Sequence, residues 1–215
     1  MPLLQQYNVG RVEVFVWKIT EAVEELLDVV PACYATSVSR FKSKNRSAQW
    51  LAVRAIVAQR FGNDVCVAYD VAGKPVLEGA DGCITVSHTD GYAVLAYSSE
   101  GGVGVDVELL SRNVLRVAER FMQAGSLENY SLPDKNSAAL VHWCAKEALY
   151  KIVGDLGGNF KDNISVGGFE LRSEGCVSLA LVGLDYCGVK DYVAHYSILD
   201  ELLVVLCQEQ DAGLL

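Results

Sequence analysis

The stretch that most constrains the fold is residues 102–108, GVGVDVE. Side chains alternate along a strand, so its valines would point to one face, while Gly104, Asp106 and Glu108 would point to the other. The two carboxylates would be about 6.5–7 Å apart at Cα, at a rise of roughly 3.3 Å per residue. Gly104 leaves room for another element to approach the backbone. The pattern predicts a buried strand with an acidic face.

A long helix is predicted from about residue 137 to residue 153, with Gly154 as its stop. Trp143, Glu147 and Lys151 are spaced i, i+4, i+8 and therefore share one stripe of this helix. Two simpler interpretations stay open. The strand carboxylates could be exposed edge positions, and Glu147–Lys151 could be a surface ion pair worth about 0.5 kcal/mol or less.

The predicted elements fall into two similar halves, residues 1–108 and 109–215, each with antiparallel strands and a long helix. This order favours an α+β fold. Strands are expected near 11–18, 83–87, 92–98, 102–108, 164–171, 176–182, 192–199 and 202–208, and helices near 45–61, 111–124 and 137–153.

Charge and cysteine content exclude several classes of protein. The net charge is −9, from 18 basic and 27 acidic residues, whereas a protein that binds nucleic acid or an anionic membrane usually has the opposite balance. Seven cysteines are scattered without C-x-x-C spacing, so neither a zinc site nor a disulfide framework is indicated. With no signal peptide or membrane-spanning apolar run in the sequence, we expect a cytoplasmic protein.

One segment, residues 40–60, is basic and contains no acidic residue. Charge runs of this kind are often a solvated helix face. The alternative is a subsite for an anion, because local positive charge attracts phosphate. The basic residues are Arg40, Lys42, Lys44, Arg46, Arg54 and Arg60.

The acidic strand does not bind a dinucleotide in the usual way. The third glycine of a G-x-G-x-x-G motif would fall at Val107, and bare carboxylates would repel a pyrophosphate. A metal ion between the strand and a phosphate would remove this repulsion. All candidate ligands are carboxylates, so Mg²⁺ is favoured over zinc, with Mn²⁺ as an alternative.

Four short motifs occur together in this chain: Gly73-Lys74-Pro75, Ser87-His88, the strand 103–108, and Trp143-x-x-Lys146-Glu147-Ala148-x-x-Lys151. In order and approximate spacing they resemble the 4′-phosphopantetheinyl transferase superfamily, in its two-half, surfactin-synthetase-activating form. The resemblance covers residues 40 to about 169. It implies two α/β halves related by a pseudo-two-fold axis, each with an antiparallel sheet and a packed long helix.

The resemblance also implies a reaction. Such enzymes transfer the phosphopantetheine arm of coenzyme A to a serine of an acyl or peptidyl carrier protein and release 3′,5′-ADP. We expect a monomer whose partners are coenzyme A and an apo carrier protein, without nucleic acid or membrane. The family's loop between Phe121 and Trp143 helps to receive the carrier, and here Phe121, Leu127 and Glu128 match it loosely.

The site residues follow from the same resemblance. Asp106, Glu108 and Glu147 would hold Mg²⁺, and Glu147 is also the candidate base for the carrier serine. Lys151 would neutralise the pyrophosphate. Lys74, Ser87 and His88 would contact the adenosine phosphates, and Arg46 the 3′-phosphate, with Arg40, Lys42 and Arg54 as further candidates.

Two other functions stay open. The same carboxylates could serve a magnesium-dependent phosphodiesterase acting on coenzyme A-like substrates, with water as the acceptor. The chain could also be a non-catalytic binder of carrier protein or coenzyme A.

Overall fold

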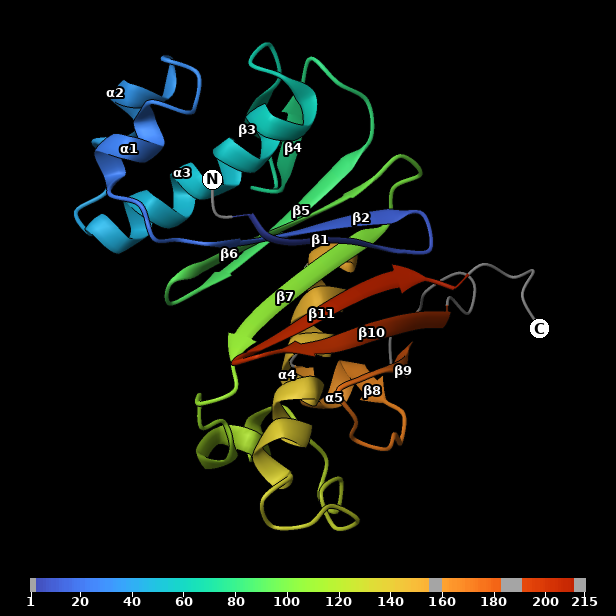
Figure 1. Ribbon diagram of the computed structural model, residues 1–215. Coiled ribbons are helices and arrows are strands. Elements are labelled where there is room, and N and C mark those ends of the chain that lie inside the picture. The colour runs from blue at the N-terminus through green and yellow to red at the C-terminus, as the bar shows by residue number, and fades with distance from the viewer. Residues whose placement is uncertain (1–2, 155–159, 183–190, 211–215) are drawn as a thin grey trace. The chain divides into compact units, whose positions relative to one another are not determined.

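The computed structural model describes residues 3–154, 160–182 and 191–210 (Figure 1). The chain forms two compact units, Met1–Gly101 and Gly102–Leu215, here called the N-terminal and C-terminal units. The predicted division after Glu108 lies too late in the sequence. Strand β7 (Val103–Leu109) pairs with β11 (Leu202–Glu209), so the acidic strand belongs to the C-terminal unit.

The N-terminal unit is built on a four-stranded antiparallel sheet with the order β1-β2-β6-β5. Helix α3 (Lys44–Phe61) packs against β6 and β2, and its Leu51 and Ile56 are buried in the core with Trp17. The other elements are β1 (Leu3–Val9), β2 (Val12–Lys18), α1 (Val23–Leu27), α2 (Tyr34–Val38), β3 (Cys66–Tyr69), β4 (Pro75–Glu78), β5 (Cys83–Thr89) and β6 (Tyr92–Ser98).

The ends of α3 follow from local chemistry. The Ser43 hydroxyl accepts a hydrogen bond from the Arg46 backbone N–H at 3.4 Å, which satisfies a donor of the first turn. At the other end Gly62 takes a φ of +90°, a conformation that L side chains rarely adopt. The predicted helix and its glycine stop are confirmed.

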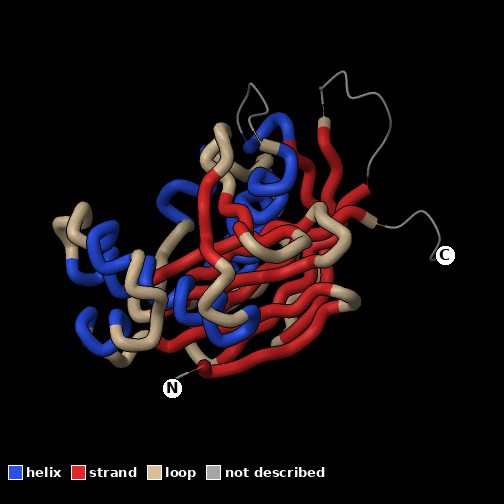
Figure 2. The backbone as a smooth tube through the Cα atoms, turned by 90° about the horizontal axis from the view of Figure 1, so that it is seen from above, coloured by secondary structure: helices blue, strands red, loops and turns tan. Residues whose placement is uncertain are grey.

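The C-terminal unit is built on a five-stranded antiparallel sheet with the order β7-β11-β10-β9-β8. Strand β11 pairs with β10 on one side and with β7 on the other. Figure 2 draws the strands of both units as red tubes. Helix α4 (Lys135–Val153) packs on β7, β11 and β10, and buries Leu140, Cys144 and Leu149. The remaining elements are the 3₁₀ helix η1 (Leu115–Arg120), α5 (Phe160–Asn163), β8 (Ile164–Val166), β9 (Glu174–Leu181) and β10 (Asp191–Leu199). The α+β class with antiparallel sheets is thus confirmed, while the pseudo-two-fold relation stays a prediction.

Gly104 allows α4 to lie directly on β7. A Cβ atom at this position would be 1.9 Å from the carbonyl oxygen of Ala148 and 3.2 Å from Cγ1 of Ile152. No side chain fits there, because real Cβ atoms essentially never come within 3.0 Å of a heavy atom outside their own residue and its chain neighbours. The structure therefore confirms that Gly104 admits a close neighbour, and it identifies that neighbour as α4.

The predicted helix 111–124 is wrong, since only the short 3₁₀ helix η1 forms in this segment. Asparagine side chains there accept backbone N–H groups that a helix entry would leave open. Asn136 Oδ1 accepts from the N–H of Val114, and Asn113 Oδ1 accepts from that of Leu115, both at 3.1 Å. These bonds satisfy backbone donors at the start of η1. The strand predicted over 164–171 is also shorter, and ends at Val166.

Candidate functional site

The acidic face of β7 is turned toward α4. Gly104 touches Ala148 of α4, and Asp106 and Glu108 follow at alternate positions on the same face. Both carboxylate residues are buried, at 6% and 9% exposure. The interpretation of these residues as exposed edge positions is therefore wrong.

Lys151 links α4 to the acidic strand. Its ammonium group donates to Asp106 Oδ1 at 2.9 Å and to the backbone oxygen of Val105 at 2.6 Å. The pair is partly shielded from water, so the attraction between the two charges is less screened than in a fully exposed ion pair. The structure thus brings together two residues that the sequence analysis assigned to one site, although they are 45 positions apart.

Glu147 lies one helical turn before Lys151. Burial raises the pKa of its carboxyl group, and the negative charge of Asp106 raises it further, while Lys151 and Arg112 act in the opposite direction. These mutual effects make Glu147 and Asp106 electrostatic neighbours. Two neighbouring carboxylates that are partly shielded from water repel each other. Binding of a proton to one of them, or of a cation between them, relieves this repulsion.

Glu108 has a partner that the sequence analysis missed. It forms an ion pair with Arg112, in the segment just after β7. The Arg112 guanidinium also lies over the ring of Trp143, at 5.6 Å from the ring centroid. An acidic and a basic residue four positions apart suggest a pair on a helix, but no helix spans these positions, so the spacing alone could not identify it.

The metal centre expected at Asp106, Glu108 and Glu147 is not assembled as a compact cluster. Over the residues that the structure describes, no group of three or more His, Cys, Asp or Glu side chains is placed to hold a metal ion. Lys151 and Arg112 engage Asp106 and Glu108 instead. The donor chemistry still suits a hard cation, because all three candidate ligands are carboxylates and Asp106 and Glu147 act on each other.

Trp143 and Lys146 hold α4 to the segments that follow η1 and precede β8. The Trp143 ring meets Phe121 edge-on, at 5.2 Å between centroids, and lies 6.0 Å from Phe160. Lys146 is buried and donates from Nζ to the backbone oxygen of Phe160 at 2.6 Å. Burial lowers the pKa of Lys146 to about 8, with the charge of Asp162 opposing this effect. These contacts fix the helix that presents Glu147.

In the N-terminal unit, Arg46 and His88 form a second candidate site. A guanidinium nitrogen of Arg46 contacts the imidazole ring, at 3.3 Å from Nδ1. Two hydrogen bonds position this pair: Asn45 Nδ2 donates to Asp90 Oδ1 at 3.0 Å, and Gln49 Nε2 donates to the backbone oxygen of Thr89 at 2.8 Å. The start of α3 is thus fastened to the β5–β6 turn, and the basic segment is more than a solvated helix face.

The other predicted anion contacts occupy different positions. Ser87 is buried in β5, on the opposite face from His88 because neighbouring strand residues alternate. Lys74 lies in the β3–β4 turn, where its backbone N–H donates to Asp70 Oδ1 at 2.8 Å and its backbone oxygen accepts from the Asp70 N–H at 3.0 Å.

Arg54 is a core residue, at 2% exposure. Its guanidinium carbon lies 3.5 Å from the centroid of the Trp50 ring, and its nitrogens donate to the Trp50 backbone oxygen at 2.9 Å and to Tyr69 Oη at 3.3 Å. Burial lowers the pKa of this guanidinium. The side chain packs within the unit instead of facing a ligand, which speaks against its expected contact with a phosphate.

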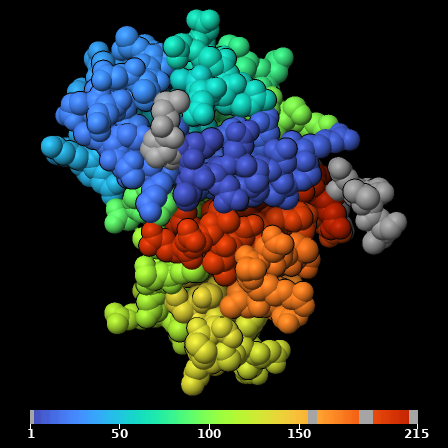
Figure 3. Space-filling model, viewed as in Figure 1, coloured from blue at the N-terminus to red at the C-terminus, as the bar shows by residue number. Residues whose placement is uncertain are grey.

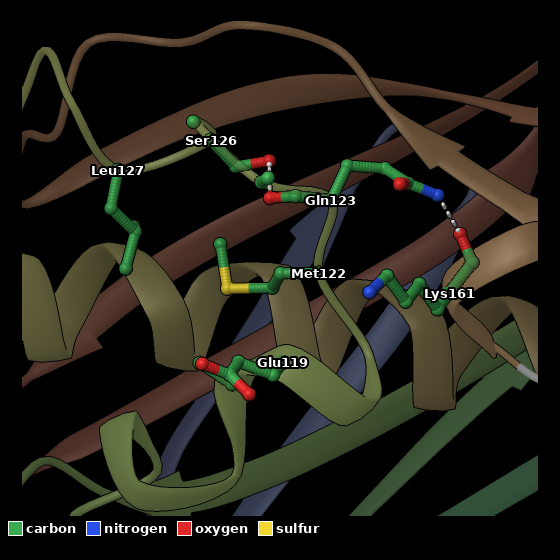
Figure 4. A pocket seen from close by; sticks show the side chains of 9 residues that line it. Glu119, Met122, Gln123, Ser126, Leu127 and Lys161 are labelled. Atoms are coloured by element: carbon green, nitrogen blue, oxygen red, sulfur yellow. Dashed lines mark hydrogen bonds between the residues drawn. The ribbon is translucent and has the colours of Figure 1, made fainter.

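A cavity of about 320 Å³ lies where η1 and the next loop meet α5 (Figure 4). Met122 and Leu127 provide apolar walls, and Glu119 and Lys161 provide charges. Gln123 closes one side, because its Nε2 donates to the backbone oxygen of Lys161 at 2.7 Å. Phe121 does not line this cavity: its side chain is buried and packs against Trp143.

In the C-terminal unit, carboxylates and a lysine therefore meet between a strand and a helix, and this arrangement is typical of a class of proteins. Comparison with known proteins identifies a narrower class. Residues 102–192 match the family model of the 4′-phosphopantetheinyl transferase superfamily. This part of the chain, which contains the acidic strand and the long helix, is similar to that superfamily, and the resemblance found in the motifs is confirmed.

A curated protein from Synechocystis sp., named "Putative 4'-phosphopantetheinyl transferase", is 29% identical to this chain over 115 residues. The alignment covers 48% of this chain and 47% of that protein, so it spans about half the length of each. Among the helices that the structure describes, none is long and apolar enough to cross a membrane.

Proposed function

We propose that this protein transfers the 4′-phosphopantetheine arm of coenzyme A to a serine of an acyl or peptidyl carrier protein. The observation that carries the proposal is the convergence of Asp106, Glu147 and Lys151 between β7 and α4. All three lie in the stretch that matches the superfamily model. In this reaction the serine oxygen bonds to the β-phosphorus, the bond to the bridging pyrophosphate oxygen breaks, and 3′,5′-ADP leaves.

Asp106, Glu108 and Glu147 would hold Mg²⁺, or Mn²⁺ in its place. Charge neutralisation of the pyrophosphate is what a bound cation supplies in phosphoryl transfer. The fit rests on the donor set: three carboxylates, two of them buried on one strand face, with the Glu147 pKa raised by burial and by Asp106.

Lys151 and Glu147 would act on the reacting atoms. Lys151 carries an ammonium group at the edge of the carboxylate site, where it can stabilise charge on the pyrophosphate. Glu147 is the candidate acceptor for the serine proton, because its raised pKa brings it nearer to the working pH. Trp143 and Lys146 would position these groups through their contacts with Phe160.

In the N-terminal unit, Arg46 and His88 would bind the adenosine phosphates, with Arg46 at the 3′-phosphate. Their contact places a guanidinium and an imidazole together, a combination that suits a phosphate. Lys74 and Ser87 remain candidates for the same ligand. Arg40 lies over the rings of Phe41 and Trp50 and is a weaker candidate.

The carrier protein would dock on η1 and the loop that follows it. This segment borders the cavity described above and exposes Leu115 and Val117. It lies on the surface at the lower end of the view in Figure 3, in yellow-green to yellow. A partly apolar surface beside a charged hollow is typical of a protein contact site.

The test is incubation of the protein with apo carrier proteins, coenzyme A and Mg²⁺, followed by intact-mass analysis of the carrier. We expect the carrier to gain one phosphopantetheine group in a Mg²⁺-dependent manner. Release of free phosphopantetheine without a carrier would show a phosphodiesterase instead, and binding without turnover would show a non-catalytic binder. A cytoplasmic, monomeric enzyme without nucleic-acid or membrane partners is part of this proposal, and a panel of fatty-acid, polyketide and peptide-synthetase carriers would identify the pathway.

A further inference from the structure

Each carboxylate of the acidic strand is engaged by a basic side chain. Lys151 engages Asp106, and Arg112 engages Glu108. Lys151 belongs to the motif that the superfamily resemblance identified, whereas Arg112 stands outside all four motifs. A cation that binds at these carboxylates has to compete with both charges, so the role of Arg112 needs an explanation of its own.

The backbone of Arg112 is held by hydrogen bonds, while its side chain is partly exposed to water. Its N–H donates to the backbone oxygen of Leu109 at 2.9 Å, and its own backbone oxygen accepts from Asn136 Nδ2 of α4 at 2.9 Å. The side chain itself is 48% exposed. Water can therefore solvate the guanidinium as soon as it leaves Glu108, and no buried cation is left behind.

Arg112 contacts both elements of the site. Its guanidinium pairs with Glu108 of β7 and lies over the ring of Trp143 of α4, at 5.6 Å from the ring centroid. One guanidinium thus supplies positive charge beside the carboxylates. Because arginine does not lose its proton under these conditions, it can only make way for another cation by moving.

We propose that Arg112 is an internal counter-ion that holds Glu108 when no metal is bound and is displaced when a divalent cation binds. The proposal rests on the assignment of Asp106, Glu108 and Glu147 as metal ligands under the proposed function. It explains why the three side chains do not form a metal-binding group within the described part of the chain. Arg112 would then be a positioning residue that sets how tightly the site binds its metal.

The experiment is titration calorimetry of the full chain with Mg²⁺, and with Mn²⁺ as a second probe, in the absence of coenzyme A and carrier. Arg112→Gln removes the competing charge, so we expect it to bind both ions about three- to tenfold more tightly. Arg112→Lys keeps the charge and should stay near the original affinity. Arg172→Gln is the matched control, because Arg172 pairs with Glu170 on the exposed surface of the same unit.

An unchanged or weaker affinity in Arg112→Gln would overturn the proposal, as would an equal gain in Arg172→Gln. Circular dichroism and thermal unfolding of the metal-free variants check that they fold. The carrier assay on the unaltered protein separates this idea from the proposed function. If the unaltered protein fails to transfer phosphopantetheine but Arg112→Gln binds the metal more tightly, the counter-ion role stands without the proposed function. If transfer is normal but Arg112→Gln has an unaltered metal affinity, the counter-ion role is ruled out.

Discussion

Replacement of Gly104 by alanine would disturb the contact between β7 and α4 at one atom. The added Cβ would lie 1.9 Å from the carbonyl oxygen of Ala148, so strand and helix would have to separate by more than about 1 Å. Overpacking of this kind costs about 1–3 kcal/mol, and the lower entropy of the unfolded alanine chain offsets about 0.4–1 kcal/mol of it. We therefore expect a net loss of up to about 2.6 kcal/mol in the free energy of unfolding.

The functional effect should exceed the effect on stability. The same contact sets how closely Glu147 approaches Asp106, and a shift of about 1 Å in such a site can reduce the rate about a hundredfold. Urea unfolding gives the stability, and the carrier assay gives kcat and KM at a temperature where the variant is folded. Gly168→Ala is the control, because nothing lies within 4 Å of its Cβ position and its φ is not in the left-handed region.

The control should keep its activity and change the free energy of unfolding by about 0.5 kcal/mol or less. If Gly104→Ala matched Gly168→Ala in both stability and rate, the close approach of α4 to β7 would not matter for the site. A large loss of stability with a normal rate in the folded protein would leave the packing argument intact and remove the functional one.

Three further predictions concern single side chains. Glu147→Gln keeps the shape of the side chain but not its charge, and the rate of transfer should fall about 10²- to 10⁴-fold. Glu174→Gln, on the exposed start of β9, is the control. A near-normal rate of Glu147→Gln at saturating Mg²⁺ would show that Glu147 has no catalytic role. Arg46→Ala should weaken the binding of coenzyme A more than that of dephospho-coenzyme A in calorimetry, and equal losses would remove Arg46 from the 3′-phosphate. Burial, aided by the charge of Lys146, lowers the pKa of His142 to about 4 in the folded chain. In the unfolded chain the pKa of this histidine is near 6.5, so the unfolded state binds a proton at a higher pH than the folded state. The contribution of His142 to the free energy of unfolding is therefore complete above pH 6.5 and is lower by about 2 kcal/mol at pH 5. In urea unfolding at both pH values His142→Phe should lose this difference, and an unchanged pH dependence would assign it to another group.

The residues that could be predicted from the sequence are those with a strict period. Alternation along residues 103–108 placed Asp106 and Glu108 on one face, and the spacing of Glu147 and Lys151 placed both on one stripe of α4. The contact of Gly104 with a neighbour also followed from the pattern. These features depend only on the geometry of a strand or a helix, so the sequence is sufficient.

Contacts made by irregular segments could not be predicted in this way. Arg112 meets Glu108 through a turn, and Asn113 and Asn136 accept backbone N–H groups at the start of η1. The basic segment 40–60 gave no sign that Arg54 points into the core while Arg46 faces His88. Charge alone does not distinguish a guanidinium that stacks on Trp50 in the core from one that lies on the surface and can bind a ligand.

The hydrogen bonds that fasten α3 to the β5–β6 turn have a consequence for affinity. Gln49 and Asn45 keep Arg46 beside His88 before any ligand arrives. An incoming phosphate would therefore meet a preorganised pair, and little side-chain entropy would be lost on binding. Under the proposed function, Gln49 would thus raise the affinity for a phosphate by holding the helix that carries Arg46.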